Sequence, residues 1–257
     1  MKPTFFFTTL FIFLFSFSLY SQSPEEISRR STDIISIDSF EMLSTLTIYD
    51  ARGNERERKI SMAGRKFGDT HKTLMRFTAP PEVQGTSMLI HNPDNADSDM
   101  WIYMPAIRRV RRIAGDDKAS NFMGSEFKNS DMTTPKVEDF NYSSLGTATI
   151  DGVICRKIEV LPKNSEIEST YGFSKQISYI EKNTYFARKV EYYDFNGELE
   201  RVQIISDYRP QPGGKYFAFL MEMENKQNGR RSVMQIDAFQ PNSEMPESAF
   251  SPAMLEN

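Results

Sequence analysis

Two Asn-Gly pairs constrain the fold of this chain more than any other feature. Asn196–Gly197 and Asn228–Gly229 each stand between segments in which apolar and polar residues alternate. Such a pair between alternating segments is the strongest short-range sign of a two-stranded β-hairpin, because the turn needs residues that tolerate positive φ. A third turn is expected at Lys182–Asn183. The second half of the chain therefore predicts consecutive antiparallel strands, not strands that alternate with helices.

The first half shows the same two-residue period. Its strand-like segments, separated by turn residues, are Thr45–Asp50, Arg58–Gly64, Thr73–Thr78, Thr86–Asn92 and Met100–Pro105. Before them, Pro24–Leu43 has an approximate helical stripe of apolar residues, and Ser23 can cap its start. We expect a mainly β protein with short helices (α+β), with about ten or eleven strands in one domain that spans residues 22–257.

One strand-like segment and one insertion complete the expected architecture. In Tyr216–Met223 both faces are largely apolar, so both need cover. A sheet curled around an apolar cavity, with a helix over it, supplies that cover.

Residues 114–142 have no two-residue alternation, and a long insertion of this kind is usually functional or disordered. Phe122, Met123 and Phe127 argue against disorder, so the insertion predicts a lid or plug that packs on the sheet.

The N-terminus predicts export. Lys2 is followed by the apolar run Phe5–Tyr20 and then by small residues, which is typical of a secretory signal cleaved near Ser21 or Gln22. The run is shorter than a membrane-spanning helix, and no cysteine stands there to accept a lipid. Cys155 is the only cysteine, so we expect no intrachain disulfide and interpret it as a small buried residue.

The sequence shows no catalytic constellation. His71 and His91 lack a second ligand at metal spacing, and neither a Gly-x-Ser-x-Gly elbow nor a phosphate-binding loop occurs. We therefore expect no enzyme, no metal and no cofactor. The formal net charge of −4 also disfavours nucleic acid as a partner.

Methionines recur through the strands and the insertion and predict a soft apolar interior. They are Met75, Met88, Met100, Met104, Met123, Met132, Met221, Met223 and Met234. Methionine is unbranched and polarizable, so it suits surfaces that accept varied apolar partners, although core filling explains any single one.

Three segments carry a resemblance to a known family. They are "MRFTAPPEVQGTSMLI" (Met75–Ile90), "DMWIYMPAIRRVRRIAG" (Asp99–Gly115) and "NFMGSEF" (Asn121–Phe127), with Asp131 after the last. This ordered set resembles the LolA-like family of outer-membrane lipoprotein-sorting proteins, as do the later "DGVICRKIEVLP", "YYDFNGEL" and "PNSEMPESAFSPAML". Glu126 departs from the family's aspartate but keeps the charge.

The resemblance implies a half-open antiparallel β-barrel with an N-terminal helix and a helical lid. It implies a monomeric periplasmic carrier that binds lipid or lipoprotein acyl chains and transfers them between envelope membranes, from an inner-membrane transporter to an outer-membrane acceptor. Two alternatives stay open. One is an accessory subunit that docks on an envelope transporter, and the other is a hydrolase with an unrecognised site.

Candidate site residues follow from these expectations. We expect the cavity to be lined by Met75, Phe77, Leu89, Trp101, Tyr103, Phe122, Met123, Phe127, Phe217, Phe219 and Met221. The arginines Arg108, Arg109, Arg111 and Arg112 have three interpretations. They clamp the lid by pairing with Asp116, Asp117, Glu126 or Asp131, they meet an anionic head group at the cavity mouth, or they form a solvated edge strand.

Overall fold

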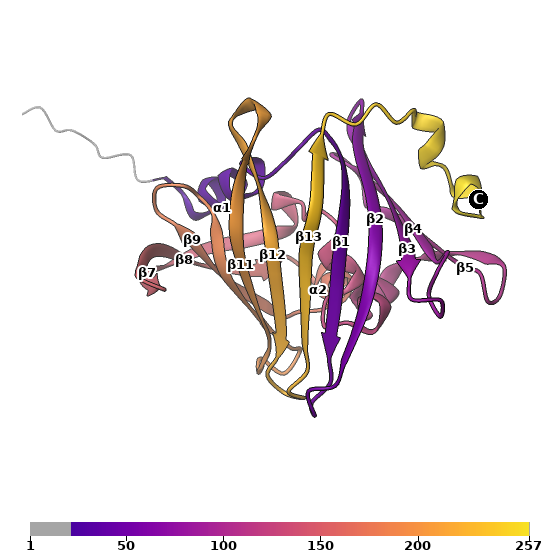
Figure 1. The fold of residues 1–257 in the computed structure, drawn as a ribbon. Helices are drawn as coiled ribbons and strands as arrows, with labels where there is room; N and C mark the ends of the chain where they lie inside the picture. Colours follow the sequence, from indigo (N-terminus) through magenta and orange to yellow (C-terminus); the bar gives the residue numbers. More distant parts are fainter. Residues whose placement is uncertain (1–21, 257) are drawn as a thin grey trace, which may run out of the picture.

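The computed structural model describes residues 22–256, and the expected signal, residues 1–21, lies outside them. Thirteen antiparallel strands form one sheet in the order β6-β5-β4-β3-β2-β1-β13-β12-β11-β10-β9-β8-β7 (Figure 1). The first group of strands is β1 (Ser39–Tyr49), β2 (Glu55–Phe67), β3 (Thr70–Ala79), β4 (Ser87–Pro93), β5 (Asp99–Met104) and β6 (Arg109–Ile113). The second group is β7 (Phe140–Ile150), β8 (Val153–Pro162), β9 (Lys175–Glu181), β10 (Ala187–Tyr193), β11 (Leu199–Gln211), β12 (Lys215–Asn225) and β13 (Arg231–Pro241).

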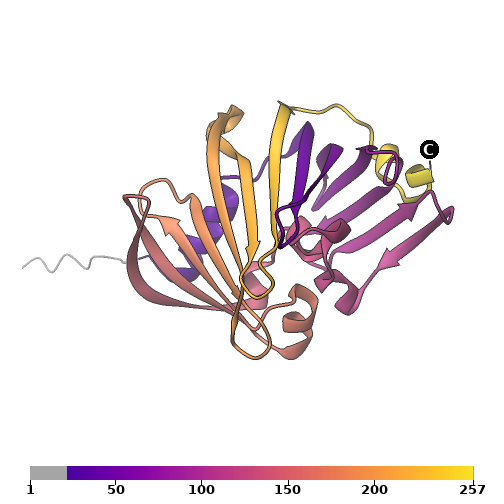
Figure 2. The same cartoon turned by 60° about the horizontal axis from the view of Figure 1, so that its bottom comes forward.

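Consecutive strands pair as hairpins, and β1 joins the two halves by pairing with β13. The turns after β10 and β12 fall at the two Asn-Gly pairs, where Gly197 and Gly229 have φ of 79° and 70°. The sheet is strongly curved (Figure 2). It is open, because β6 and β7 each have a neighbouring strand on one side only. The mainly β fold is confirmed, whereas the count of ten or eleven strands was too low.

The N-terminal helix is shorter than predicted. Helix α1 covers Pro24–Asp33, and its N-cap Ser23 accepts a hydrogen bond from the backbone N–H of Glu26 at 3.1 Å. The prediction of helix as far as Leu43 is wrong, because Ser39–Leu43 already belongs to β1. There, Phe40 and Met42 pair with β2 and β13, so sheet pairing outweighs the weak helical pattern.

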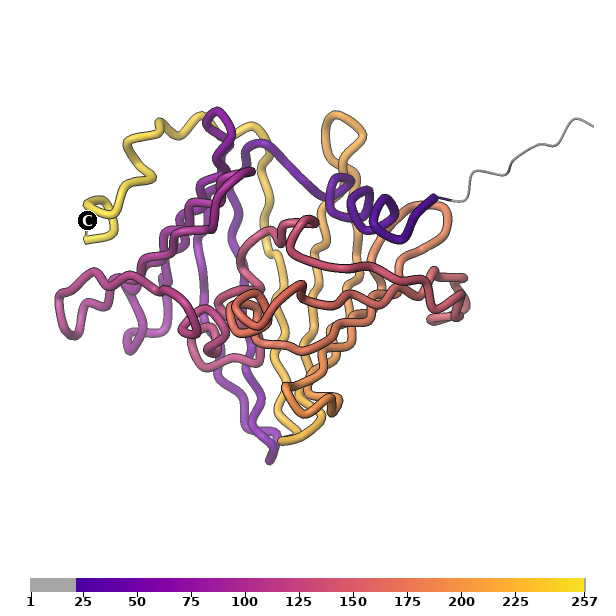
Figure 3. Tube along the Cα trace, turned by 180° about the vertical axis from the view of Figure 1, so that it is seen from behind, coloured from indigo at the N-terminus to yellow at the C-terminus, as the bar shows by residue number. Residues whose placement is uncertain are grey.

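The two faces of the sheet are covered by different parts of the chain. Helix α1, the insertion and helix α2 (Ser165–Tyr171) lie across the concave face (Figure 3). The C-terminal segment, with short 3₁₀ helices at Glu247–Phe250 and Pro252–Glu256, packs on the convex face of β3 to β5. One apolar cluster therefore fills the concave side, and a separate smaller cluster lies beneath the C-terminal segment.

The insertion is structured, as predicted. It contains four 3₁₀ helices, at Gly115–Ala119, Phe122–Gly124, Asn129–Met132 and Val137–Asp139. The residues expected to end it, from Phe140 onward, form β7 instead.

Candidate functional site

A cavity of about 370 Å³ lies on the concave face, between the sheet, the end of α1 and the insertion. Six methionines line it: Met42, Met62, Met75, Met132, Met221 and Met234. Three of them form a cross-strand row, because Met42 pairs with Met62 and Met62 pairs with Met75. Alternation along β1, β2 and β3 places this row on the concave face. The wall is therefore apolar and built from flexible side chains.

A second cavity of about 320 Å³ adjoins the first beneath α1. It extends over β7 to β12, and aromatic side chains such as Phe140, Phe173 and Tyr192 line it. Both cavities share seven lining residues: Thr32, Ile35, Asp131, Thr133, Pro135, Phe217 and Met221. The two volumes are thus neighbouring compartments under one cover, formed by α1 and residues 131–137.

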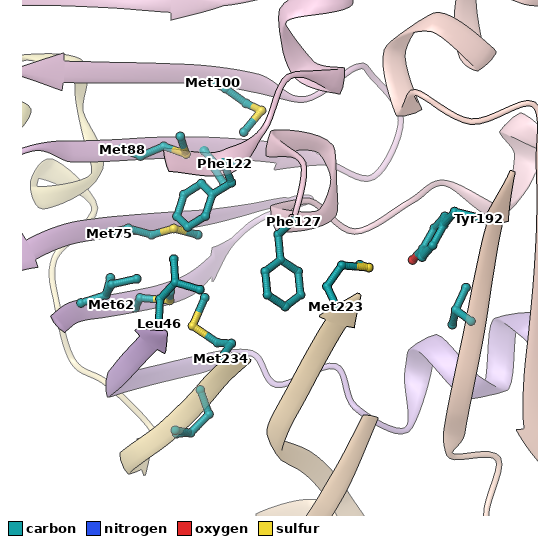
Figure 4. Close-up of a cluster of buried hydrophobic side chains, with 14 of the residues drawn as sticks. Leu46, Met62, Met75, Met88, Met100, Phe122, Phe127, Tyr192, Met223 and Met234 are labelled. Atoms are coloured by element: carbon teal, nitrogen blue, oxygen red, sulfur yellow. The ribbon is translucent and has the colours of Figure 1, made fainter. Parts of the chain in front are cut away.

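The first half of the insertion is a plug. Phe122 and Phe127 are 0% and 2% exposed and point into the concave core, where Phe122 lies near Met75 and Met88 (Figure 4). The rings of Phe77 and Phe122 are 5.8 Å apart. Burying two such rings is worth several kcal/mol of folding free energy, at about 1.5–3 kcal/mol each. The two rings therefore belong to the packed core, and Phe127 also borders the cavity.

Polar contacts attach the plug to β12, β13 and the turn between them. The carboxylate of Glu126 is 1% exposed and accepts a hydrogen bond from Asn225 Nδ2 at 3.0 Å. It also lies 2.9 Å from Arg230 Nε, and the backbone N–H of Glu126 donates to Ser232 Oγ at 2.9 Å. Glu126 is therefore hydrogen-bonded through Oε2 and lies beside the Arg230 guanidinium through Oε1.

A buried guanidinium provides the second attachment. Arg201 on β11 is 1% exposed, and its Nη1 lies 2.7 Å from Asp131 Oδ2 and 3.1 Å from the carbonyl oxygen of Glu126. Its guanidinium carbon also lies 4.6 Å from the ring centre of Tyr192. Burial is the largest single influence and lowers the pKa of Arg201, but the combined effect of Asp131, Tyr192 and Glu200 raises that pKa above its ordinary value.

The predicted clamp exists, but its arginines were assigned wrongly. Glu126 and Asp131 pair with Arg230 and Arg201, and within residues 22–256 neither contacts the Arg108–Arg112 cluster. Of the other proposed partners, the Asp116 carboxylate accepts a hydrogen bond from Ser169, and Asp117 forms no ion pair with a residue of the Arg108–Arg112 cluster within residues 22–256.

The cluster itself lies on the edge strand. Arg112 pairs with Asp99 on β5, whereas Arg108, Arg109 and Arg111 are exposed and form no ion pair with another described residue. None of the four lines either apolar cavity. Their role in meeting a head group at the cavity mouth therefore has no geometric support.

Three residues predicted to line the cavity lie on the opposite face. Leu89, Trp101 and Tyr103 pack in the convex cluster with Phe250 and Leu255. The C-terminal segment is held there by hydrogen bonds from Ser87 Oγ to the Leu255 carbonyl (2.7 Å) and between His91 Nε2 and the Phe250 carbonyl (2.8 Å). The prediction that Trp101 lines the cavity is wrong, because the alternation of β5 turns it away from Met100 and Ile102.

The other predicted residues divide into three groups. Met75, Phe217 and Met221 line the main cavity together with Phe127, while Phe77, Phe122 and Phe219 are packed core, and Met123 borders a small separate pocket. The sequence reasoning missed Met42, Met62, Ile236 and the end of α1 as lining residues. Alternation along β1, β2 and β13 was the available signal.

His71 is the one histidine in the cavity wall. Its Nε2 lies 3.2 Å from the Ile37 carbonyl, and its ring stacks on Phe40 at 6.3 Å. Burial lowers the pKa of His71, which favours the neutral form of its ring. A Cβ at Gly64 would lie 2.5 Å from the Phe40 ring, so only glycine allows this packing.

Two negative findings concern the described residues alone. Between residues 22 and 256 no group of three or more His, Cys, Asp or Glu side chains is placed to hold a metal ion. In the same range no helix has the length and apolar character needed to cross a membrane.

Comparison with known proteins gives one family and several related structures. A family model for an uncharacterized protein matches residues 69–257. An outer membrane lipoprotein-sorting protein domain from Vibrio parahaemolyticus superposes with a TM-score of 0.84 at 25% identity, covering 91% of this chain and 98% of that one. No match to a curated protein is found.

Two further structures share the fold. A DUF1329 family protein from Desulfovibrio piger has a TM-score of 0.82 at 23% identity, covering 90% of this chain and 97% of that one. A LolA superfamily protein from Nitrosomonas europaea has a TM-score of 0.71 at 17% identity, covering 90% and 98% of the two chains.

Proposed function

We propose that the chain, which belongs to a family of uncharacterized proteins and shares the fold of an outer-membrane lipoprotein-sorting domain and of a LolA superfamily protein, is a carrier for lipid or lipoprotein acyl chains. The observation that carries this proposal is the pair of adjoining apolar cavities beneath α1 and residues 131–137.

The cavities have the size and lining that an acyl chain requires. Each falls at the lower end of the volume range of small-molecule pockets, roughly 300–1,000 Å³. Each buried methylene contributes about 0.8 kcal/mol of transfer free energy, so a chain of modest length is retained without covalent chemistry. The methionine wall adapts to chains that differ in length or unsaturation.

The cover has two parts of unequal attachment. The plug around Phe122 and Phe127 and the adjoining Asp131 are anchored by buried contacts of Glu126 and Arg201. The rest of the cover is held by more exposed ion pairs, such as Lys136 with Asp97 and Arg29 with Glu138. Release of the chain then involves displacement of α1 and residues 131–137 by a partner that binds the open form more tightly. An inner-membrane donor and an outer-membrane acceptor are the partners that fit this cycle.

The proposed setting is the periplasm. Residues 1–21 have the pattern of a cleaved signal peptide, and a carrier between two membranes has to work in the space between them.

Native mass spectrometry tests the proposal. The protein is expressed with its N-terminal segment in a Gram-negative host and purified without detergent, and the expected result is a bound mass that extracts as phospholipid or acylated peptide. Met221→Trp, which fills the region shared by both cavities, should lower the bound fraction at least tenfold. The control Phe195→Trp adds the same ring at a site that is 63% exposed.

One outcome would contradict the carrier proposal. If both variants and the parent protein stay free of ligand, even after incubation with phospholipid vesicles, the cavities do not hold acyl chains. Crosslinking to envelope proteins would then test the accessory-subunit alternative.

A further inference from the structure

A third, polar pocket of about 290 Å³ lies on the other side of the wall that bounds the apolar cavities. Thr133 lines all three pockets, and Ser130 and Tyr171 are shared with the second apolar cavity. Residues 130–136 therefore form a thin partition, with methionines and aromatic rings on one side. Asparagine, threonine and charged side chains line the other.

The polar pocket contains a buried ammonium group that forms no ion pair within residues 22–256. Lys118 is only 8% exposed, and its Nζ donates to the carbonyl oxygen and to Oγ of Ser98 at 2.6 and 3.1 Å. A lysine ammonium has three donors, so one remains for a ligand. Burial lowers the pKa of Lys118, as expected for a charge removed from water.

The carboxylates nearest to Lys118 are already neutralised. Asp97 lies 2.9 Å from Lys136 Nζ, and Asp99 is paired with Arg112. A buried charge is costly unless it is paired. An anionic group that enters the pocket would supply the missing partner of Lys118.

Two other carboxylates in the same pocket lack a cation. Asp139 accepts a hydrogen bond from the Tyr171 hydroxyl at 3.2 Å, whereas Glu166 is exposed on α2. Neither carboxylate forms an ion pair with another described residue. They disfavour a purely anionic ligand and favour one that also carries an amine. The pocket therefore matches a ligand with both charges.

We propose that this pocket binds the aminoalkyl phosphate head group of a zwitterionic phospholipid, with the phosphate at Lys118 and the amine at Asp139 and Glu166. The proposal deepens the carrier function and rests on it, because the acyl chains of the same molecule would pass beside Thr133, which lines all three pockets, to reach the apolar cavities. It names the substrate class as aminophospholipid. A free aminoalkyl phosphate has the same head chemistry and is the other source to be distinguished.

Calorimetric titration with short-chain lipids below their micelle concentration tests the proposal. Dihexanoyl phosphatidylethanolamine should bind at least tenfold more tightly than dihexanoyl phosphatidylglycerol, which lacks the amine. Free phosphoethanolamine should bind more weakly than the lipid, and a chain-independent affinity would identify a soluble aminophosphate as the source. Inorganic phosphate alone should bind more weakly than phosphoethanolamine.

Substitutions test which residue binds the phosphate and which binds the amine of the head group. Lys118→Met should lower the affinity for the ethanolamine lipid at least tenfold, while Lys182→Met, at an exposed turn lysine, leaves it unchanged. Because Lys118 is buried, Glu166→Gln on the exposed face of α2 gives a second test that is safe for folding. It should abolish the preference for ethanolamine over glycerol.

Three results would overturn the proposal: equal affinity for the two lipids, an unchanged affinity in a folded Lys118→Met protein, or an undiminished preference in Glu166→Gln. Hexanoic and decanoic acid, which lack the head group, report the apolar cavities separately. If the fatty acids bind and Met221→Trp blocks them while the head group gives no selectivity, the carrier function stands and the head-group site fails.

Discussion

The guanidinium of Arg201 and the carboxylate of Asp131 meet at 2.7 Å in the interior of the protein, joining β11 to the insertion across 70 residues of sequence. The side chains are only 1% and 13% exposed. Such a pair adds little net stability compared with an apolar pair, but loss of one partner leaves the other buried and uncompensated. The pair therefore fixes where the insertion lies more than it stabilises the fold.

The first prediction concerns this pair. Asp131→Asn keeps the shape of the side chain but removes the charge opposite Arg201, and we expect it to lower the free energy of unfolding by about 3–5 kcal/mol. Urea denaturation measures the loss, and limited proteolysis of residues 114–142 should become faster. Arg112→Gln breaks an exposed pair with Asp99 and serves as the control, with a loss below about 1 kcal/mol. Equal losses in both variants would contradict the anchoring role.

The second prediction separates the exposed arginines from the insertion. Because Arg109 and Arg111 form no ion pair within residues 22–256, the double substitution to alanine should leave the proteolysis rate of residues 114–142 unchanged. The free energy of unfolding should change by less than about 0.5 kcal/mol. Faster cleavage in this variant would restore these arginines as the clamp.

These two sets of arginines show where sequence reasoning succeeds and where it fails. The chemistry of the clamp, arginine against the carboxylates of the insertion, was predicted from residue types. Its partners could not be, because Arg201 and Asp131 meet only after the sheet has curved. Proximity in sequence favoured Arg108–Arg112, whereas the fold placed that cluster on an edge strand.

The strands show the same division. Segments such as Thr73–Thr78 were predicted because one face is buried and the residues alternate, while β7 was missed because its Ser143–Gly146 region is exposed on both faces. Alternation also separated Trp101 from Met100 and Ile102, but it cannot say which face of a sheet becomes concave. The face on which Trp101 lies is covered by the C-terminal segment, which follows Trp101 by about 150 residues in the sequence.

The third prediction tests that C-terminal cover. Phe250 is 1% exposed in the cluster with Leu89 and Trp101, and Phe250→Ala should lower the free energy of unfolding by about 3–5 kcal/mol through cavity formation. Water then reaches Trp101, the only tryptophan, so its emission should shift to longer wavelength. The exposed Ile107→Ala is the control, with neither effect expected.

The fourth prediction follows from the same placement. An acyl ligand in the methionine-lined cavity lies on the opposite face of the sheet from Trp101, so saturation with decanoic acid should leave the emission maximum of Trp101 unchanged. A ligand-dependent shift of Trp101 in the parent protein would place binding on the convex face.

The fifth prediction is a pH dependence of stability that originates in His71. Burial lowers the pKa of His71 below its ordinary value of about 6.5, so between the two values the unfolded chain binds more protons than the folded one. The stabilising contribution of the neutral ring is therefore complete above about pH 6.5 and is lost as the pH falls toward the folded pKa. Urea denaturation should give a smaller free energy of unfolding at pH 6.0 than at pH 7.5.

Substitution identifies the residue responsible. The pKa of His91 is also lowered by burial, so each histidine contributes a share of the decline. His71→Gln should lose its share and keep that of His91, and the double variant with His91→Gln should be almost independent of pH in this window, which lies above the titration of ordinary carboxylates. If His71→Gln declines as steeply as the parent protein, the ring of His71 is not the buried neutral group that closes the cavity wall beside Phe40.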